Sequence, residues 1–293
     1  MSDSSAGGGF DAFTVTTDRG PHVTMQAGVV HLGRHWTTTS RPSLKASVVR
    51  RRRRAAVTTG DGTAWTIIAG PATSLDAADP SSLLVDPVTT WLAGGAVVRL
   101  GLSRLDQVRG YGEAGAAVPA DFLPQGRVLL VTRPADRLVV ADGEVVAHGG
   151  RWRRPGPPPT LDGDRPGRWR REAVLRAVPD AVAVLASAPG PCWLGLSTAD
   201  GAVAVPATWD PATGRAETDL VPLSWLAAEL PGPVCVTFDD SSSRRPDRKT
   251  GLLLRGRGHV VAVDERYAGV GFEVVRTTWW EGFRSASAEV TAT

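Results

Sequence analysis

The stretch HWTTTSRPSLKASVVRRRRRAAV, at His35–Val57, decides the fold of this chain. Its threonines are typical of a strand, predicted over His35–Thr39, and the Ser-Arg-Pro that follows indicates a turn. A helix is predicted over Ser43–Arg52, because the Ser43 hydroxyl can accept a hydrogen bond from the free backbone amides of the first turn. A second strand is predicted over Ala55–Thr58. This order places the start of a helix beside the end of a strand.

The first turn of this helix carries a cation in an unfavourable place. Lys45 stands at the positive end of the helix dipole, so its charge is better explained if an anion lies at the same end. Hydroxyls, cations and exposed backbone amides together predict a phosphate-binding site. The side chains of this predicted site are Thr39, Arg41, Ser43 and Lys45. A capped surface helix without a ligand is the alternative that these residues leave open.

Five consecutive arginines, Arg50–Arg54, follow at the end of the predicted helix. Neighbouring helical residues point about 100° apart, so the five side chains cannot all contact one ligand. A solvated helix end, where cations favour the negative end of the dipole, is the first interpretation. The alternatives are that one or two arginines reach the bound phosphate, or that the run contacts nucleic acid.

Length, charge and cysteine content limit the class of protein. The chain has 293 residues, enough for about two domains with a sizeable core, and 42% of them are hydrophobic. Lys+Arg 33 against Asp+Glu 30 gives a net charge of +3, which argues against a nucleic-acid-binding surface. Cys192 and Cys235 are the two cysteines, too few for a zinc ribbon or a four-cysteine iron–sulfur cluster.

The sequence shows neither a secretory signal nor a membrane span. Residues 1–9 are small and polar, and no apolar run reaches the roughly 18 residues that cross a bilayer. We therefore expect a cytoplasmic protein that makes no membrane contact.

A break in composition divides the chain. Residues 149–171 read GGRWRRPGPPPTLDGDRPGRWRR. Proline lacks the backbone donor that a strand needs and glycine weakens regular structure, so this stretch predicts a linker. The predicted division is a tail at 1–9, a first domain at 10–148 with the phosphate site, the linker at 149–171, a second domain at 172–287 and a tail at 288–293.

Both halves contain short Val, Ala and Leu segments between glycine, proline and aspartate, a pattern typical of antiparallel β structure. The other predicted strands are Val23–Ala27, Ala64–Ala69, Arg127–Thr132, Leu138–Ala141, Cys192–Ser197, Ala202–Trp209, Val234–Phe238, Leu252–Val261 and Val274–Trp279. Further helices are predicted at Pro87–Val108, Arg171–Val178 and Pro222–Leu230. The first of these places five apolar side chains on one helical face: Val88, Trp91, Val98, Leu102 and Leu105.

Three motifs match known site patterns only in part. Gly110–Gly115 fits GxGxxG, but a helical stretch precedes it and Pro119 follows, so it predicts the loop that ends a helix. His31 and His35 have the spacing of a metal pair, yet no third ligand is evident. Residues 195–199 lack the final glycine of a hydrolase nucleophile elbow. We therefore expect no metal site, and no catalytic side chain is assigned.

Tryptophan is unusually common, with ten tryptophans against six phenylalanines and two tyrosines. Trp280 directly follows Trp279, the last residue of a predicted strand, and neighbours on a strand face opposite sides. One of the pair is therefore predicted in the core and the other at a pocket or an interface.

The run Trp36–Ala46, followed by Arg50–Val57, resembles the pyridoxamine 5′-phosphate oxidase-like family of split-barrel flavin and deazaflavin proteins. The family pattern is an aromatic residue, then Thr-x-Arg-x-Ser-x-Lys-Ala, an arginine-containing helix end and a strand. Gly20–Thr24 resembles the first strand of the family, and Gly70–Asp76 resembles its Gly-Arg-Ala strand. Val48 and Arg53 depart from the pattern, where the family has Asn and Pro.

The resemblance implies a mainly β fold with minor α, consisting of two tandem split β-barrels that form a pseudo-dimer within one chain. Residues 234–239 and 251–258 resemble strands of the second barrel. In this family the cofactor lies between two barrels. Further oligomerisation is left open.

By the same resemblance, the cofactor phosphate is held by residues on the family pattern, namely Thr39, Arg41, Ser43, Lys45 and Arg54. The strand that carries His22 and Thr24 is expected to face the flavin ring. The matching stretch of the second half, Pro222–Leu226, lacks a basic residue, so one phosphate site is expected. The loop Ser241–Thr250, with its arginines and Lys249, is expected to close over this site.

The predicted function is an oxidoreductase that depends on FMN or, as the alternative cofactor, a deazaflavin, and that acts on an unidentified small molecule. The alternative function is a non-catalytic or degenerate split-barrel module that binds flavin or heme without turnover. A third hypothesis is an adaptor that contacts nucleic acid or a membrane through Arg50–Arg54.

Overall fold

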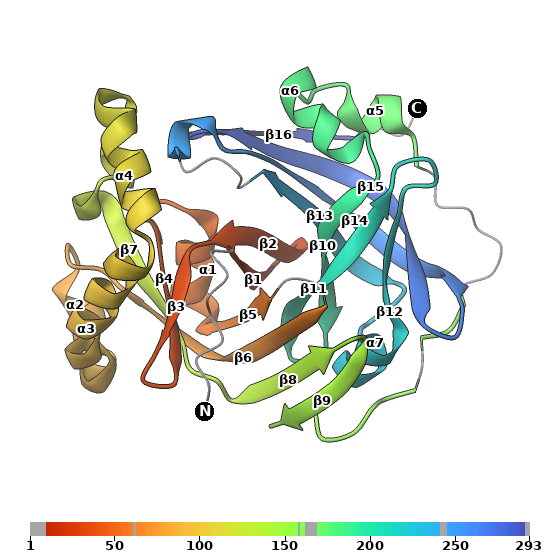
Figure 1. Cartoon of the computed structure of the whole chain (residues 1–293), viewed down its shortest axis with the longest axis horizontal. Coiled ribbons are helices and arrows are strands. Elements are labelled where there is room, and N and C mark those ends of the chain that lie inside the picture. Colours follow the sequence, from red (N-terminus) through yellow and green to blue (C-terminus); the bar gives the residue numbers. More distant parts are fainter. Residues whose placement is uncertain (1–9, 61–62, 158, 162–168, 241–244, 291–293) are drawn as a thin grey trace.

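The computed structural model describes residues 10–60, 63–157, 159–161, 169–240 and 245–290. Strands predominate over helices, so the expected fold class, mainly β with minor α, is confirmed. The N-terminal half builds one antiparallel sheet and the C-terminal half builds a second, and the two pack against each other (Figure 1). The predicted tail at 1–9 lies outside the described residues, as does part of the predicted linker.

The first sheet is an open half-barrel with the strand order β2-β1-β5-β6-β7-β4-β3, and β8 and β9 extend it from β6. Its strands are β1 (Asp11–Thr17), β2 (Gly20–Gln26), β3 (Gly28–His31), β4 (Arg34–Ser40), β5 (Arg54–Gly60), β6 (Ala64–Leu75), β7 (Arg127–Thr132), β8 (Asp136–Ala141) and β9 (Glu144–Gly149). Both faces of β1 are buried, because Phe13 and Val15 pack on the helix side while Ala12 packs on the second sheet.

Helix α1 (Leu44–Arg52) connects β4 to β5. Its buried residues Ala46, Val48 and Val49 pack against β1 and β5. The helix ends at Arg53, whose φ of 51° is left-handed and turns the chain into β5. The predicted helix over Ser43–Arg52 is therefore confirmed.

A helical segment is inserted between β6 and β7. It contains α2 (Pro80–Leu84), α3 (Pro87–Ser103), α4 (Leu105–Ala114) and the 3-10 turns η1 (Gly115–Ala117), η2 (Ala120–Phe122) and η3 (Pro124–Gly126). Asp79 and Asp86 cap the starts of α2 and α3 with their side chains. Ala96 of α3 is buried against Trp36, and α2 and α3 lie at the outer edge of the molecule (Figure 1).

The second sheet has the order β12-β11-β10-β13-β14-β15-β16, and β12 also pairs with β15, so its strands close into a ring. Its strands are β10 (Gly190–Thr198), β11 (Gly201–Asp210), β12 (Arg215–Asp219), β13 (Gly232–Asp240), β14 (Thr250–Val263), β15 (Tyr267–Glu281) and β16 (Arg284–Glu289). Short helical elements flank it: α5 (Arg171–Leu175), α6 (Asp180–Ala183), η4 (Val184–Ala186), α7 (Leu220–Leu226) and η5 (Pro246–Arg248). β16 extends two residues into the segment predicted as a tail at 288–293.

The strand pairing of the first half recurs in the second. β1 pairs with β2 and β5, as β10 pairs with β11 and β13, and the path β5-β6-β7-β4 corresponds to β13-β14-β15-β12. The halves also exchange matching hydrogen bonds. The Thr58 hydroxyl on β5 donates to the Ala204 carbonyl on β11 (2.6 Å), and the Thr237 hydroxyl on β13 donates to the Val23 carbonyl on β2 (3.3 Å). The two halves are therefore related by a pseudo-two-fold within one chain.

Apolar side chains fill the boundary between the sheets. Val23 packs there with Cys235 and Leu253, and Trp280 lies against them. Trp279, its neighbour on β15, packs instead against the core of the ring. The prediction that the two tryptophans face opposite sides is confirmed.

Each predicted strand overlaps an observed one, but β1, β3, β9, β12 and β16 were not predicted. The predicted helix Pro87–Val108 is wrong in its continuity, because the backbone at Arg104 (φ −128°) separates α3 from α4. The prediction of a loop at Gly110–Gly115 is also wrong. Residues 110–114 form the end of α4, and the helix stops at Gly115, whose φ is 52°.

Candidate functional site

The start of α1 is built by hydroxyl groups from two elements. Ser43 is in an extended conformation, and its Oγ accepts a hydrogen bond from the Ala46 amide (3.3 Å), which caps the helix. The Thr39 hydroxyl at the end of β4 donates to the same Ser43 oxygen (3.1 Å). The proton of the Ser43 hydroxyl therefore remains available to an acceptor outside the helix.

Lys45 lies in the first turn of α1, and its Nζ donates to the Thr24 hydroxyl on β2 (3.2 Å). Burial and the nearby positive charge of Arg127 lower the pKa of Lys45 to about 7, while Asp239 of β13 acts in the opposite direction. The helix start, β2 and the second sheet therefore meet at this ammonium group.

Arg127, at the start of β7, was not predicted as a site residue. It pairs with Ser40 across β4 and β7, and its guanidinium donates to the Thr38 hydroxyl (2.7 and 3.1 Å) and to the Tyr111 hydroxyl (3.2 Å). Arg127 is far from Lys45 in the sequence, so the motif around Lys45 did not point to it. The available signal was a charged residue at the start of an otherwise apolar strand.

His22 of β2 connects the site to the second sheet. The Arg255 guanidinium on β14 donates to Nδ1 of His22 (3.0 Å). Burial and the charges of Arg255 and Lys45 lower the pKa of His22 to about 3. The imidazole is therefore neutral near pH 7, and because Nδ1 accepts, its proton is assigned to Nε2.

Arg255 is a buried cation at the boundary between the sheets, with 6% of its surface exposed. Burial lowers its pKa, and its Nε finds no hydrogen-bond partner among the described residues. Sequence reasoning placed this residue within a predicted strand without a role. Neither Arg127 nor Arg255 was predicted as a site residue. Arg127 lies near Lys45, and Arg255 contacts His22.

Arg41 makes contacts of its own. Its Nε donates to Asp76 (2.7 Å) and an Nη donates to the Gln125 carbonyl (2.9 Å). This ion pair holds the pKa of the Asp76 carboxyl below its usual value against the effect of burial. The side chain therefore joins the turn after β4 to the segment after β6.

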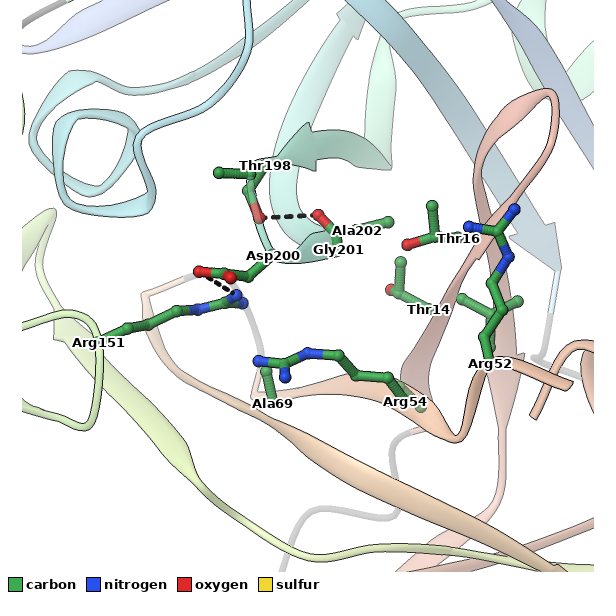
Figure 2. A pocket seen from close by; sticks show the side chains of 13 residues that line it. Thr14, Thr16, Arg52, Arg54, Ala69, Arg151, Thr198, Asp200, Gly201 and Ala202 are labelled. Carbon is green, nitrogen blue, oxygen red and sulfur yellow. Dashed lines mark hydrogen bonds and ion pairs between the residues drawn. The ribbon is translucent and has the colours of Figure 1, made fainter. Parts of the chain in front are cut away.

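Arg54 lies at the opposite end of α1 from Lys45, and that the two share a ligand stays a prediction. α1 has nine residues, so about 13 Å of helix separates its start from its end, where Arg54 follows. The Arg54 guanidinium donates to Asp136 (3.1 Å) and lines a separate cavity together with Arg52 and Arg151 (Figure 2).

The arginine run divides among several partners. Arg50 donates to the Arg41 carbonyl (3.3 Å), Arg52 pairs with Asp18, and Arg53 ends the helix. This arrangement agrees with the interpretation of a solvated helix end and gives the five side chains no common surface.

The start of α7 in the second half differs from that of α1. Its N-cap position is held by Asp219, whose side chain makes no capping hydrogen bond and pairs with Arg266 (3.8 Å). Burial raises the pKa of the Asp219 carboxyl. A carboxylate at this position disfavours a bound phosphate, in line with the expectation of one phosphate site.

Residues 241–244 of the predicted closing loop lie outside the described residues. Lys249 is described and lies over the Phe10 ring (3.7 Å). Burial lowers the pKa of Lys249 to about 8, with Asp239 acting in the opposite direction. Lys249 and Lys45 therefore share the influence of Asp239.

His31 and His35 lie on neighbouring strands and have different surroundings. His31 ends β3, whereas His35 lies on β4 with its Nε2 at 2.8 Å from Asp11. The described part of the chain contains no group of three or more His, Cys, Asp or Glu side chains that could hold a metal ion.

No helix in the described part of the chain is long and apolar enough to cross a membrane.

No protein-family model and no curated protein matches the sequence. Among solved structures, the chain is similar to a pyridoxamine 5′-phosphate oxidase-related, FMN-binding protein from Nostoc punctiforme, at 16% identity and a TM-score of 0.32, over 46% of this chain and 75% of that one. It is similar to general stress protein 26 from Bacillus anthracis, at 10% identity and a TM-score of 0.30, over 46% of this chain and 85% of the other. It is also similar to an F420 reductase, at 15% identity and a TM-score of 0.30, over 44% and 89% of the two chains.

Proposed function

We propose that the start of α1 binds the phosphate of a flavin-type cofactor, FMN or a deazaflavin, and that the protein is an oxidoreductase that uses it. The observation that carries this proposal is the position of Lys45. Its ammonium lies beside the second cation Arg127, in surroundings that lower its pKa to about 7. A bound phosphate would offset both the burial and the repulsion.

The residues present fit a phosphate group. Lys45 and Arg127 supply positive charge, and Ser43 keeps a hydroxyl proton to donate. The exposed amides at the helix start add further donors. The same side chains, apart from Arg127, fall on the family pattern that the sequence resembles.

The remaining side chains suit the edge of a cofactor site between two sheets. His22 is neutral and has its Nε2 proton to donate, because Arg255 occupies Nδ1. Trp280 and Val23 form apolar surface at the same boundary, which limits access of water. A bound flavin or deazaflavin would supply hydride transfer, and the protein would position it. No side chain is assigned as acid or base.

One observation favours the second candidate, a module in which the site binds its ligand without turnover or has lost binding. Asp239 is a carboxylate close enough to raise the pKa of Lys45, so it competes with an anionic ligand for this ammonium group. Arg127 acts on the pKa of the same ammonium group in the opposite direction.

Cofactor binding is tested by titrating the purified full chain with FMN and, separately, with a deazaflavin, and recording the quenching of cofactor fluorescence. We expect saturable binding of one of them, weakened at least about tenfold by Lys45→Ala because a hydrogen-bonded charge is lost. Arg51→Ala removes an equal charge from an exposed position on the same helix and is the matched control. Absence of binding, or equal loss in both variants, would contradict the proposal.

Turnover is a separate measurement on the cofactor-loaded protein. Oxidation of a reduced nicotinamide by the FMN-loaded chain, or oxidation of the reduced deazaflavin, would support the oxidoreductase. Cofactor binding without either reaction would support the non-catalytic module.

A further inference from the structure

A cavity of about 450 Å³ lies between the two sheets at the far end of α1 (Figure 2). β1 and the residues that follow α1 form one side, and the turn between β10 and β11 forms another. Its volume falls within the range of small-molecule sites, about 300–1,000 Å³. It does not include Lys45 or the start of α1, so it is independent of the proposed cofactor site.

Three guanidinium groups line this cavity: Arg52, Arg54 and Arg151. Arg54 and Arg151 share one carboxylate, that of Asp136, at 3.1 and 3.3 Å. Arg151 also pairs with Asp200 (3.0 Å), whose side chain is largely exposed. Arg52 pairs with Asp18, so three carboxylates face the three guanidinium groups. Nε and Nη1 of Arg151 make no hydrogen bond to the described residues, and Arg54 contributes to the lowered pKa of Arg151.

A buried hydroxyl adds a second and independent observation. Thr14 on β1 is 0% exposed and lines the cavity, and its Oγ1 finds no hydrogen-bond partner among the described residues. A buried hydroxyl without a partner is unfavourable, so a ligand that bonds to it would be stabilised. The Thr198 hydroxyl, in contrast, donates to the Gly201 carbonyl (2.7 Å).

We propose that this cavity binds a small phosphorylated compound. A phosphate dianion accepts several hydrogen bonds at once and pairs with guanidinium groups in a bidentate manner. Arg54 and Arg151 approach it from the first half, and the turn at Gly201 approaches it from the second. Such a ligand would contact residues of both sheets.

The test uses the Lys45→Ala chain, in which the start of α1 no longer offers an ammonium group, so that its outcome is separate from that of the cofactor titration. Glucose 6-phosphate is titrated calorimetrically, with inorganic phosphate and glucose as comparisons. We expect glucose 6-phosphate to bind, glucose not to bind, and Arg54→Gln to weaken binding about tenfold. Arg153→Gln, at a neighbouring exposed position, is the matched control.

Thr14→Val replaces the hydroxyl with a methyl of similar size, so it tests the site without removing charge. We expect a loss of affinity of about threefold or more, with retained thermal stability. No binding of either phosphate at millimolar concentration, or unchanged affinity in both Arg54→Gln and Thr14→Val, would overturn the site.

A second inference rests on a different surface, the outer face of α3. Four large apolar side chains on this helix are exposed: Val88 (60%), Trp91 (82%), Val98 (61%) and Leu102 (66%). The sequence predicts that they share one helical face, and the structure leaves that face uncovered. We name it the α3 stripe. Gly94 and Gly95 lie between Trp91 and Val98, and both glycines line a hollow beside them.

The spacing of the α3 stripe suits a second copy of the same stripe. Counting Gly95, the intervals alternate between three and four residues, the spacing of a helix pair that packs side by side. An antiparallel arrangement about Gly95 brings Val88 opposite Leu102 of the other copy and Trp91 opposite position 99, next to Val98. The bulky tryptophan would then enter the hollow on the Gly94 side, because the His31 ring already lies against Gly95, and the face is self-complementary there.

The exposed area and the charge point to the same occupant. The exposed apolar surface of the four side chains of the stripe is on the order of 500 Å² per copy, the larger part of the roughly 800 Å² per partner of a standard interface. From Pro87 to Ser103 the only charged residue is Arg99. We infer that the α3 stripe pairs with that of a second chain to form a two-fold dimer.

The test is sedimentation velocity of the full chain over a concentration series. We expect a dimer at micromolar concentration, and a monomer for Trp91→Glu, which places a charge in the centre of the stripe. Val146→Glu, at an exposed apolar position on β9, is the matched control and should remain dimeric. A monomeric wild type at 100 μM or more, or a dimer that survives Trp91→Glu, would overturn the inference, as would a monomer that binds phospholipid vesicles through this face.

Discussion

The Arg255 guanidinium donates to Nδ1 of His22 across the boundary between the two sheets, at 3.0 Å. The two residues are 233 positions apart in the sequence, and the arginine is nearly fully buried. Because the histidine nitrogen accepts, the contact is a charge-to-neutral hydrogen bond and requires an unprotonated imidazole. After burial, this contact from the second half of the chain is the next cause that keeps a histidine of the first half neutral.

His22 should stay neutral to low pH. Its pKa is lowered from 6.5 to about 3 by burial, Arg255 and Lys45. The unfolded chain binds this proton near pH 6.5 and the folded chain does not, so the free energy of unfolding should fall as the pH decreases from 6.5 towards 3. In Arg255→Met the pKa of His22 should rise but stay below 6.5, because the imidazole remains buried. An NMR titration that shows wild-type His22 protonating near pH 6.5 would contradict this account.

Binding of FMN at the start of α1 should weaken as the pH rises above 7. In the ligand-free protein Lys45 has a pKa of about 7, and a bound anion raises this pKa. At a pH between the pKa of the free protein and that of the complex, binding therefore takes up a proton. The dissociation constant should increase by up to about tenfold per pH unit between pH 7 and 8.5, where the phosphate charge is already constant. Lys45→Arg keeps its charge throughout, so its affinity should be flat. An equally flat wild type would disprove the role of Lys45.

Ser43→Ala should destabilise the protein even without a ligand. The substitution removes the acceptor of the Ala46 amide and of the Thr39 hydroxyl, and a lost helix cap costs about 1 kcal/mol of unfolding free energy. Urea unfolding of the ligand-free chain measures this difference. Ser47→Ala, within the same helix, should change stability by less than about 0.5 kcal/mol. Equal effects of the two substitutions would show that Ser43 does not cap the helix.

Neither cysteine should react in the folded protein. Both thiols are buried, and burial raises the pKa of Cys235 to about 11 and that of Cys192 further still. Since the thiolate is the reactive form, a colorimetric thiol reagent should label the native chain slowly and the unfolded chain at both sites. Rapid labelling of one thiol before unfolding would show that the core around that cysteine opens in solution.

The local part of the candidate site could be predicted from the sequence. Ser43, Lys45 and the preceding strand lie within eleven residues, and a capped helix after a strand is a short-range pattern. The position of Arg54 could not be judged in this way. Residues close in the sequence need not be close in space, and α1 separates Arg54 from Lys45 by its full length.

The long-range part could not be predicted. Arg127 and Arg255 reach the site only because β7 pairs with β4 and β14 packs near β2, and one sequence does not fix strand pairing. The exposure of Trp91 could not be predicted either. Periodicity tells which side chains share a face, but not whether another part of the chain covers that face.

The reciprocal bonds of Thr58 and Thr237 have a consequence for how the protein can evolve. When two identical subunits assemble, any substitution occurs in both, so both ends of the boundary must tolerate it. Here the two halves are encoded separately and held together by one backbone. Lys45 can remain at one helix start while Asp219 occupies the other, and a change that suits one end leaves the other end untouched.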